Sequence, residues 1–429
     1  MVVSSREYDM TMIECLENDV FSGERMNSIK ELEELTVEGR PSGIEAEEVE
    51  IIHDPFNPEE IFIKTKEVPM DTVIRRIRKG TINLAPAFQR NSVWGKKQKS
   101  RLIESLMLKI PLPMFYVAGD KQEKWDVVDG LQRLTTICEF LFGSSKYEEI
   151  IKLKELDYSH GFKLEGLEFW GDKYNNKRFD DLPDILQTRI LESAFTFTII
   201  EAGTPEVVRR NIFKRINTGG MPLTPQEIRH ALYQGESTML LEQLSTNKYF
   251  IRAVSSSIDD SRMGAREMIL RMLSFVMRSY KEYPNNNDMD SFICDTMIAI
   301  NNSPDNLENS GVKNIRIENV KNICLQFERG MQRAHDLFGE YAFRRSVPGR
   351  RKTPVNKSLF EVWGTILSRM KSSTFDKLIN DKQNFMKNYE SYISDHKVEL
   401  ALSRNSWMKS SVDLRFQRAY ELIKDYRSN

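Results

Sequence analysis

The chain has 429 residues and a formal net charge of −1 at neutral pH, a length that accommodates two or three domains, each with its own core. Its apolar fraction of 40% and charged fraction of 29% are typical of a folded soluble protein and argue against wholesale disorder. No stretch reaches the roughly 18 uninterrupted apolar residues of a membrane span, and the N terminus lacks a signal-peptide pattern, so we expect a cytoplasmic protein.

Cysteine and histidine are sparse and scattered. The four cysteines form no CxxC pair, and the five histidines are isolated from one another. Disulfide frameworks, structural zinc and histidine-led metal sites are therefore not expected. Any metal in this chain would be bound by oxygen ligands.

The first 50 residues are strongly acidic. They contain 14 Asp or Glu and 4 Lys or Arg, a net charge of −10, so the rest of the chain carries +9. We interpret residues 1–55 as an acidic N-terminal extension that is at most partly ordered. An acidic arm on a basic body can cover a phosphate-binding surface by attraction, or it can simply keep the protein in solution, which is the simpler interpretation.

A compact domain that mixes helices and strands begins near residue 56. Apolar spacing predicts a short helix within VPMDTVIRRIRKG and a longer one over 96–110, which the prolines of IPLP end. Two short strands at 114–118 and 125–128 flank a polar turn and predict a hairpin. The next helix follows an Asp-Gly pair and stops at Gly143.

Further elements complete this domain. PDILQTRILES predicts a helix and AFTFTII a strand. Two helices then open with Thr-Pro, at Thr204 and Thr224, where threonine supplies the N-cap and proline the first helical residue. Glu227 completes a Thr-x-x-Glu capping box in the second of them. The glycine pair of NTGGMPL, between the two helices, can bring backbone N–H groups close to an anion.

Beyond residue 236 the strand signals vanish and helical periodicity repeats. The clearest helical segments are 266–280, 317–338, 356–370 and 413–426. We therefore predict an α+β fold in three parts. These parts are the acidic extension at 1–55, a domain with a small mixed sheet and flanking helices at 56–236, and an all-helical domain at 237–429.

Missing motifs exclude several enzyme classes. GxxxxG occurs at 161–166, but Leu167 stands where a P-loop needs lysine. The GxSxG pattern of serine hydrolases is absent, and no cysteine has a credible histidine partner. An HNH-type nuclease would need a histidine that leads a metal-bound turn, and none of the five histidines lies in such a setting.

The stretch DVVDGLQRLTT at 126–136 joins a buried strand to a helix. Asp129 ends the strand, Gly130 permits a sharp turn, and Gln132 and Arg133 fall in the first helical turn. Free N–H groups there bind anions. The helix dipole stabilises a bound negative charge by roughly a further 0.5–2 kcal/mol. Arg133 could clamp a phosphate and Asp129 a divalent cation. In the structural alternative, which spacing alone favours because Asp-Gly turns are common, Asp129 caps the helix and Arg133 meets solvent or a surface acid.

Three ordered blocks surround this turn: AFQRNSVWGKKQKSRLIESLMLKIPLPMFYV, DVVDGLQRLTTICEF and NIFKRINTGGMPLTPQEIRHALYQG. Together they resemble the N-terminal domain of GmrSD-type restriction and defence proteins, a branch of the ParB/sulfiredoxin-like superfamily of DGQQR-motif proteins. The resemblance covers residues 60–236 and implies a ParB/sulfiredoxin-like fold there. It also implies NTP binding and hydrolysis.

The resemblance assigns the turn to nucleotide phosphate. Asp129, Gly130, Gln132 and Arg133 match the family's Asp-Gly-Gln-Gln-Arg motif. Leu131 departs from the commoner first glutamine, but it fits the apolar face of the helix, so we expect it to pack inward and leave the site intact.

The other two blocks imply further contacts to phosphate or metal. The matching residues are Gln89, Arg90, Asn217, Thr218, Gly219, Gly220, Glu227 and Arg229. In the family's first block the arginine faces the phosphates. The simpler alternative is that Trp94 belongs to the core, Arg90 pairs on the surface and Glu227 is only the capping-box acid.

From this resemblance we expect a nucleotide-binding, Mg²⁺-dependent NTP-hydrolysing protein of a bacterial anti-phage defence or restriction type. Arg133, Arg90 and the helix-start N–H groups would hold the phosphates, Asp129 would hold Mg²⁺, and water would attack a phosphoryl group. Many relatives join this domain to an HNH nuclease domain. Without such a site here, a nuclease step would need a separate nuclease or other defence subunit.

Two alternatives from other classes stay open. One is a non-catalytic DNA-binding or assembly module related to partition proteins, for which DNA binding would depend steeply on salt. The other is a structural protein whose acidic extension contacts a partner. All of these interpretations are compatible with a homo-oligomer.

Overall fold

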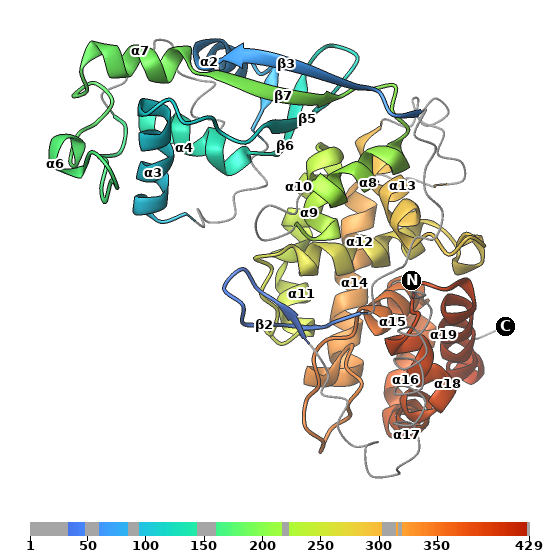
Figure 1. The fold of residues 1–429 in the computed structure, drawn as a ribbon. Helices are drawn as coiled ribbons and strands as arrows, with labels where there is room; N and C mark the ends of the chain where they lie inside the picture. The colour runs from blue at the N-terminus through green and yellow to red at the C-terminus, as the bar shows by residue number, and fades with distance from the viewer. Residues whose placement is uncertain are drawn as a thin grey trace, which may run out of the picture.

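The computed structural model describes residues 33–47, 60–84, 94–143, 160–216, 223–302, 315 and 320–426. They form one part built on a five-stranded sheet and a second part made mainly of helices (Figure 1). This arrangement confirms the predicted α+β fold class. None of the helices in these ranges is long and apolar enough to cross a membrane.

The sheet is mixed and has the strand order β3-β7-β5-β6-β4. Its strands are β3 (Ile63–Pro69), β4 (Ile82–Asn83), β5 (Phe115–Gly119), β6 (Trp125–Asp129) and β7 (Ala194–Ile200). β5 and β6 form the predicted antiparallel hairpin, whereas β5 runs parallel to β7 and β4 parallel to β6. Tyr116 pairs with Asp129, and Phe115 pairs with Phe197. The end of β6 and the starts of β5 and β7 therefore lie at one edge of the sheet.

Helices pack against both faces of this sheet. The helices of the first face are α2 (Met70–Arg78), α3 (Lys96–Met107), α4 (Leu131–Phe142) and α7 (Asp184–Glu192), with the single turn α6 (Gly171–Tyr174) beside them. The helices of the opposite face are α8 (Glu206–Ile216) and α9 (Pro225–Leu232). Val117 and Val127 enter the first core, and their neighbours Ala118 and Val128 enter the second. This alternation follows from the two-residue repeat of a strand.

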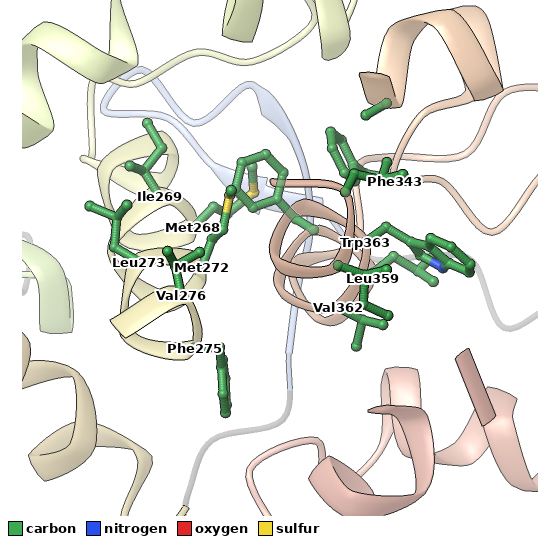
Figure 2. Packing of buried hydrophobic residues seen from close by; sticks show 14 of the residues in the cluster. Met268, Ile269, Met272, Leu273, Phe275, Val276, Phe343, Leu359, Val362 and Trp363 are labelled. Atoms are coloured by element: carbon green, nitrogen blue, oxygen red, sulfur yellow. The ribbon is translucent and has the colours of Figure 1, made fainter. Parts of the chain in front are cut away.

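The helical part is organised around two buried helices. Its helices are α10 (Glu236–Ser245), α11 (Lys248–Ala253), α12 (Gly264–Met277), α13 (Met289–Asn301), α14 (Val320–Phe338), α15 (Lys357–Arg369), α16 (Ser372–Asn380), α17 (Lys382–Ser394), α18 (His396–Ser403) and α19 (Lys409–Leu422), with short 3₁₀ turns at Tyr280–Glu282, Gly339–Tyr341 and Lys424–Tyr426. α12 and α15 are buried along almost their whole length, as expected for helices at the centre of a bundle. Figure 2 shows Met268 and Met272 of α12 and Leu359 of α15 in this core. A Cβ at Gly364 would lie 2.6 Å from Met272 Sδ, so the glycine lets the two helices approach closely.

Residues 33–47, which we call the strap, belong to the helical part. β1 (Glu33–Leu35) and β2 (Pro41–Glu45) form an antiparallel hairpin. Glu45 N donates to Val355 O and Val355 N donates to Gly43 O, each at 2.9 Å. Ile44 is fully buried in the same core as α12 and α15. This piece of the predicted acidic extension is therefore an integral element of the helical fold.

Replacing Ile44 by Asp is expected to lower the free energy of unfolding by about 3–4 kcal/mol, because an unpaired carboxylate would replace a packed apolar side chain. Urea denaturation measures this change. Leu35→Asp in the same hairpin is the matched control, since Leu35 is 57% exposed, and it should change stability by less than about 0.5 kcal/mol. Equal effects at the two positions would contradict the anchoring of the strap by Ile44.

Candidate functional site

The turn between β6 and α4 depends on Gly130. Its φ of +91° lies in the left-handed region, which residues with a side chain rarely adopt. A Cβ at this position would also lie 2.2 Å from Cδ1 of Phe115. Backbone conformation and space therefore both require glycine, and the turn starts α4 directly at the edge of the sheet.

Gly130→Ala is expected to destabilise the protein by about 2–4 kcal/mol, because left-handed strain adds to a steric clash. Gly39→Ala separates the two causes, since Gly39 also has a positive φ, +75°, but a Cβ at that position would have nothing within 4 Å. That control should cost only about 1 kcal/mol. Thermal denaturation of both variants measures the difference, and a loss at Gly130 no larger than at Gly39 would argue against close packing on Phe115.

The N terminus of α4 is open to an acceptor. No described side chain caps this helix, and Leu134 N is the first N–H to bond within it, to Gly130 O at 3.0 Å. The N–H groups of Leu131, Gln132 and Arg133 are the ones that a helix start leaves without an intrahelical partner. The helix dipole adds partial positive charge at the same point. The arrangement favours an anion such as a phosphate group.

Arg133 folds back over the turn. Its Nη2 donates to Asp129 Oδ2 at 2.9 Å and to Met114 O at 3.2 Å, and its Nη1 donates to Pro113 O. The guanidinium carbon lies 4.5 Å from the ring centroid of Phe115, a cation–π contact. Burial lowers the pKa of Arg133, and the carboxylate of Asp129 opposes this shift. Arg133 thus fixes the Asp129 carboxylate and the chain that enters β5 to the start of α4.

Asp129 pairs with Arg133 and does not cap α4, so the capping role in the structural alternative is wrong. The Asp129 side chain is 34% exposed, and its Oδ2 is the oxygen that accepts from Arg133. A carboxylate oxygen suits Mg²⁺, which binds one or two protein carboxylates and completes its shell with water and substrate phosphates. No group of three or more His, Cys, Asp or Glu side chains in the described ranges could hold a metal. Among the described residues, Asp129 could therefore hold Mg²⁺ only as a single protein ligand, with water or phosphate oxygens completing the shell.

A cavity of about 370 Å³ lies at the same edge of the sheet. Its apolar lining consists of Leu106, Ile110, Pro111, Leu112, Ala194 and Phe195, and its polar lining consists of Lys109, Arg189, Glu192 and Ser193. Phe195 packs edge-on against Phe115, with 5.3 Å between the ring centroids. Phe115 in turn makes the cation–π contact with Arg133. The end of β6 and the start of β7 are separated by β5 alone, so the cavity lies about two strand spacings, or roughly 10 Å, from the turn.

No sequence motif pointed to this cavity. The IPLP segment, which we used only as a helix terminator, forms one of its walls. The carbonyls of Pro113, the last residue of this segment, and of Met114 accept from Arg133. Pro111, which lines this wall, was thus the available signal.

Glu227 and Arg229 lie where α9 meets the helical part. Glu227 is 1% exposed, completes the capping box of α9 and pairs with Arg262 at 3.1 Å. Arg229 is 2% exposed and pairs with Asp290 and, at 3.5 Å, with Glu267. These contacts give both residues a structural role that joins α9 to α12 and α13.

The remaining predicted site residues, Gln89, Arg90, Asn217, Thr218, Gly219 and Gly220, lie outside the described residues. Trp94, which follows the first of these blocks, is half-buried against the core of the first sheet face. The aromatic residues Phe140, Phe213 and Tyr233 are buried, so they serve as packing residues.

Comparison with known proteins finds a family match within the sheet part. Residues 71–234 match the family model described as "GmrSD restriction endonuclease, N-terminal domain". The matched range contains the Asp129 turn, the wall of the 370 Å³ cavity and α9. None of the curated proteins and none of the solved structures compared with the chain matches it.

Proposed function

Because residues 71–234 match the family model of the GmrSD N-terminal domain, which suggests a restriction or defence-type protein, we propose that the chain binds a nucleoside triphosphate at the Asp129 turn and hydrolyses it. The observation that carries the proposal is the uncapped N terminus of α4, which starts at a glycine that both the backbone conformation and the packing on Phe115 favour. Backbone N–H groups, a helix dipole and a nearby carboxylate meet at this point. A polyphosphate is the ligand that uses all of them.

The N–H groups of Leu131, Gln132 and Arg133 would bind phosphate oxygens. Arg133 would act mainly as a positioning residue, because its terminal nitrogens are engaged with Asp129, Met114 and Pro113. For Arg133 to grip a phosphate directly, it would exchange one of these partners. Water would then attack a phosphoryl group, and the bond to the departing nucleotide would break to release phosphate.

Asp129 is the residue that would hold Mg²⁺. The ion would neutralise phosphate charge and polarise a phosphoryl oxygen. Arg133 fixes the carboxylate of Asp129 in its direction through the 2.9 Å hydrogen bond, so the ligand is oriented before the nucleotide arrives. Such preorganisation lowers the cost of assembling the site.

We propose that the nucleobase binds in the 370 Å³ cavity. Its apolar walls suit the faces of a planar base, and Lys109, Arg189 and Glu192 provide charged groups for its polar edge. The separation of roughly 10 Å from the turn suits a ribose and a phosphate chain between base and helix. Arg189 is half-buried and donates to Met107 O at 3.2 Å, so its position is fixed on one side.

Release of inorganic phosphate from each of the four common NTPs, with and without Mg²⁺, tests the proposal. We expect turnover of at least one NTP, and its loss in Asp129→Asn. Lys121→Gln, in the exposed turn between β5 and β6, is the control and should leave turnover unchanged. Absence of both binding and phosphate release with every NTP would overturn the proposal.

DNA in the same reactions addresses the alternative functions. Salt-sensitive DNA binding without nucleotide turnover would support a DNA-binding or assembly module instead. We also propose that DNA cleavage, where it occurs, depends on a separate nuclease subunit. Metal-dependent cutting of plasmid DNA by the purified chain alone would contradict that part.

A further inference from the structure

The strap places two carboxylates among buried cations of the helical part. Glu34 pairs with Lys357, and Glu47 pairs with Arg271. Lys357 and Arg271 are only 4% and 3% exposed in their side chains. Both cations also contact Glu267, at 3.3 Å and 3.7 Å, so the strap acids share these cations with an acid of α12.

The cluster would carry excess positive charge without the strap. Its six cations are Arg210, Arg229, Arg262, Arg271, Lys357 and Arg415, and its four acids outside the strap are Glu227, Glu267, Asp290 and Glu361. Among the described residues, six cations against four carboxylates outside the strap leave two positive charges. Glu34 and Glu47 supply the two negative charges that balance them, and buried charge without such a counterion is costly.

A cavity of about 250 Å³ opens at this cluster. Its charged lining consists of the cations Arg229, Arg262, Arg271 and Lys357, the acids Glu267 and Asp290, and both strap acids. Thr224 and Pro225, at the start of α9, also line it, so the cavity lies at the seam between the sheet part and the helical part. It is separate from the Asp129 turn and from the 370 Å³ cavity, with which it shares no lining residue.

The strap is anchored at a point distinct from these two acids. Ile44 and the backbone bonds to Val355 hold the middle of the strap, whereas Glu34 and Glu47 lie toward its ends, with side chains 32% and 16% exposed. The carboxylates can therefore turn out while the backbone of β2 stays in place. Burial raises the pKa of Glu34, and Lys357 opposes the shift. Keeping this carboxylate ionised in its buried position therefore costs desolvation free energy.

We propose that the seam cavity binds an oxyanion of the phosphate class, which takes the places of the Glu34 and Glu47 carboxylates on Lys357 and Arg271. Guanidinium and ammonium groups bind phosphate oxygens as well as carboxylate oxygens. The carboxylates of Glu34 and Glu47 then compete with the oxyanion for Lys357 and Arg271, and they occupy these cations when no oxyanion is bound. The proposal does not depend on nucleotide binding at the Asp129 turn.

Calorimetric titration of the full chain with inorganic pyrophosphate tests the competition. The variant Glu34→Gln/Glu47→Gln should bind pyrophosphate about tenfold more tightly than wild type or better, because neutral amides no longer compete for the two cations. Adding Lys357→Gln to this variant should abolish the gain, which separates the seam cavity from any phosphate site at α4. Glu38→Gln is the matched control in the same hairpin, since Glu38 pairs with Arg40 at the exposed surface, and it should leave the affinity unchanged.

Equal affinity of wild type and the double variant would overturn the proposal, as would a gain that survives Lys357→Gln. Where the double variant does not fold by circular dichroism, Glu34→Gln alone decides, because Glu34 is the more exposed of the two acids. Its pyrophosphate affinity must then exceed that of wild type.

Oligonucleotides with and without a terminal phosphate identify the source of the phosphate group. Binding that needs the terminal phosphate indicates a phosphomonoester, and equal binding indicates a nucleic-acid backbone.

Discussion

Replacing Glu361 by Gln is expected to lower the free energy of unfolding by about 3–5 kcal/mol, because removal of one member of a buried ionic group leaves the others uncompensated. Glu361 on α15 is fully buried and pairs with Arg271 of α12 and with Arg415 of α19. Arg415 is itself fully buried. Glutamine keeps the shape and one acceptor, so the loss reports the charge and not a cavity.

Glu390→Gln is the control for this variant, because Glu390 pairs with Arg350 at the exposed surface. It should change stability by no more than about 0.5 kcal/mol. Chemical denaturation at low and high salt adds a second criterion, since a surface pair weakens with salt and a buried one much less. A loss at Glu361 equal to that at Glu390 would show that α12, α15 and α19 are not held by this ionic group.

Replacing Arg133 by Met is expected to lower kcat/KM for NTP hydrolysis by about 10²-fold to 10³-fold, because the Asp129 carboxylate and the segment before β5 lose their common anchor. Methionine retains the packing on Phe115 but none of the hydrogen bonds. Arg133→Lys should recover little activity, since a single ammonium cannot reproduce the planar fork that reaches Asp129, Met114 and Pro113.

Arg75→Met is the matched control for Arg133→Met, because Arg75 is an exposed arginine at the end of α2 whose side chain bonds to the neighbouring Thr72. It should leave kcat/KM unchanged. Wild-type kinetics in Arg133→Met would remove Arg133 from the site. Full recovery by lysine would show that charge matters there and geometry does not.

The hairpin and the helix at the Asp129 turn could be predicted from the sequence because their signals are local. β5 and β6 alternate residues between two cores, and Gly130 and Gly143 mark the two ends of α4. The two Thr-Pro starts predicted α8 and α9 for the same reason, and Thr224 and Glu227 form the expected capping box. Each of these signals lies within a few residues of the element that it specifies.

β3 and β4 were not predicted from the sequence, each for a different reason. β3 is an edge strand with the sequence IKTKEVP, in which only Val68 is buried, so it lacks the apolar alternation of a half-buried strand. β4 has two residues, too few for any periodicity. Both strands exist because a neighbouring strand pairs with them, β7 in one case and β6 in the other.

The strap and its ionic cluster depend on contacts between distant parts of the sequence. Arg271 interrupts the apolar run MILRMLSFVM, and its partner Glu47 is 224 residues away. Ile44 is one of few apolar residues in an acidic segment, and its bridge partner Val355 is distant in the sequence. Composition predicted a solvated extension because contacts with partners so distant in the sequence cannot be inferred from the local residues.

At the candidate site, the sequence predicted the turn between β6 and α4 but not the partners of its arginine. Asp129, Gly130 and Arg133 were singled out from spacing and resemblance. The carbonyls of Pro113 and Met114 are backbone groups, which no side-chain motif reveals. The structure therefore adds a positioning role for Arg133 to the phosphate contact that the motif suggested.

A crystal structure of the full chain with Mg²⁺ and a non-hydrolysable NTP analogue tests the central claim most directly. We predict phosphate oxygens within hydrogen-bond distance of the N–H groups of Gln132 and Arg133, with the metal on Asp129 and the base in the 370 Å³ cavity. A nucleotide whose phosphates lie away from the start of α4, in the seam cavity for example, would contradict it.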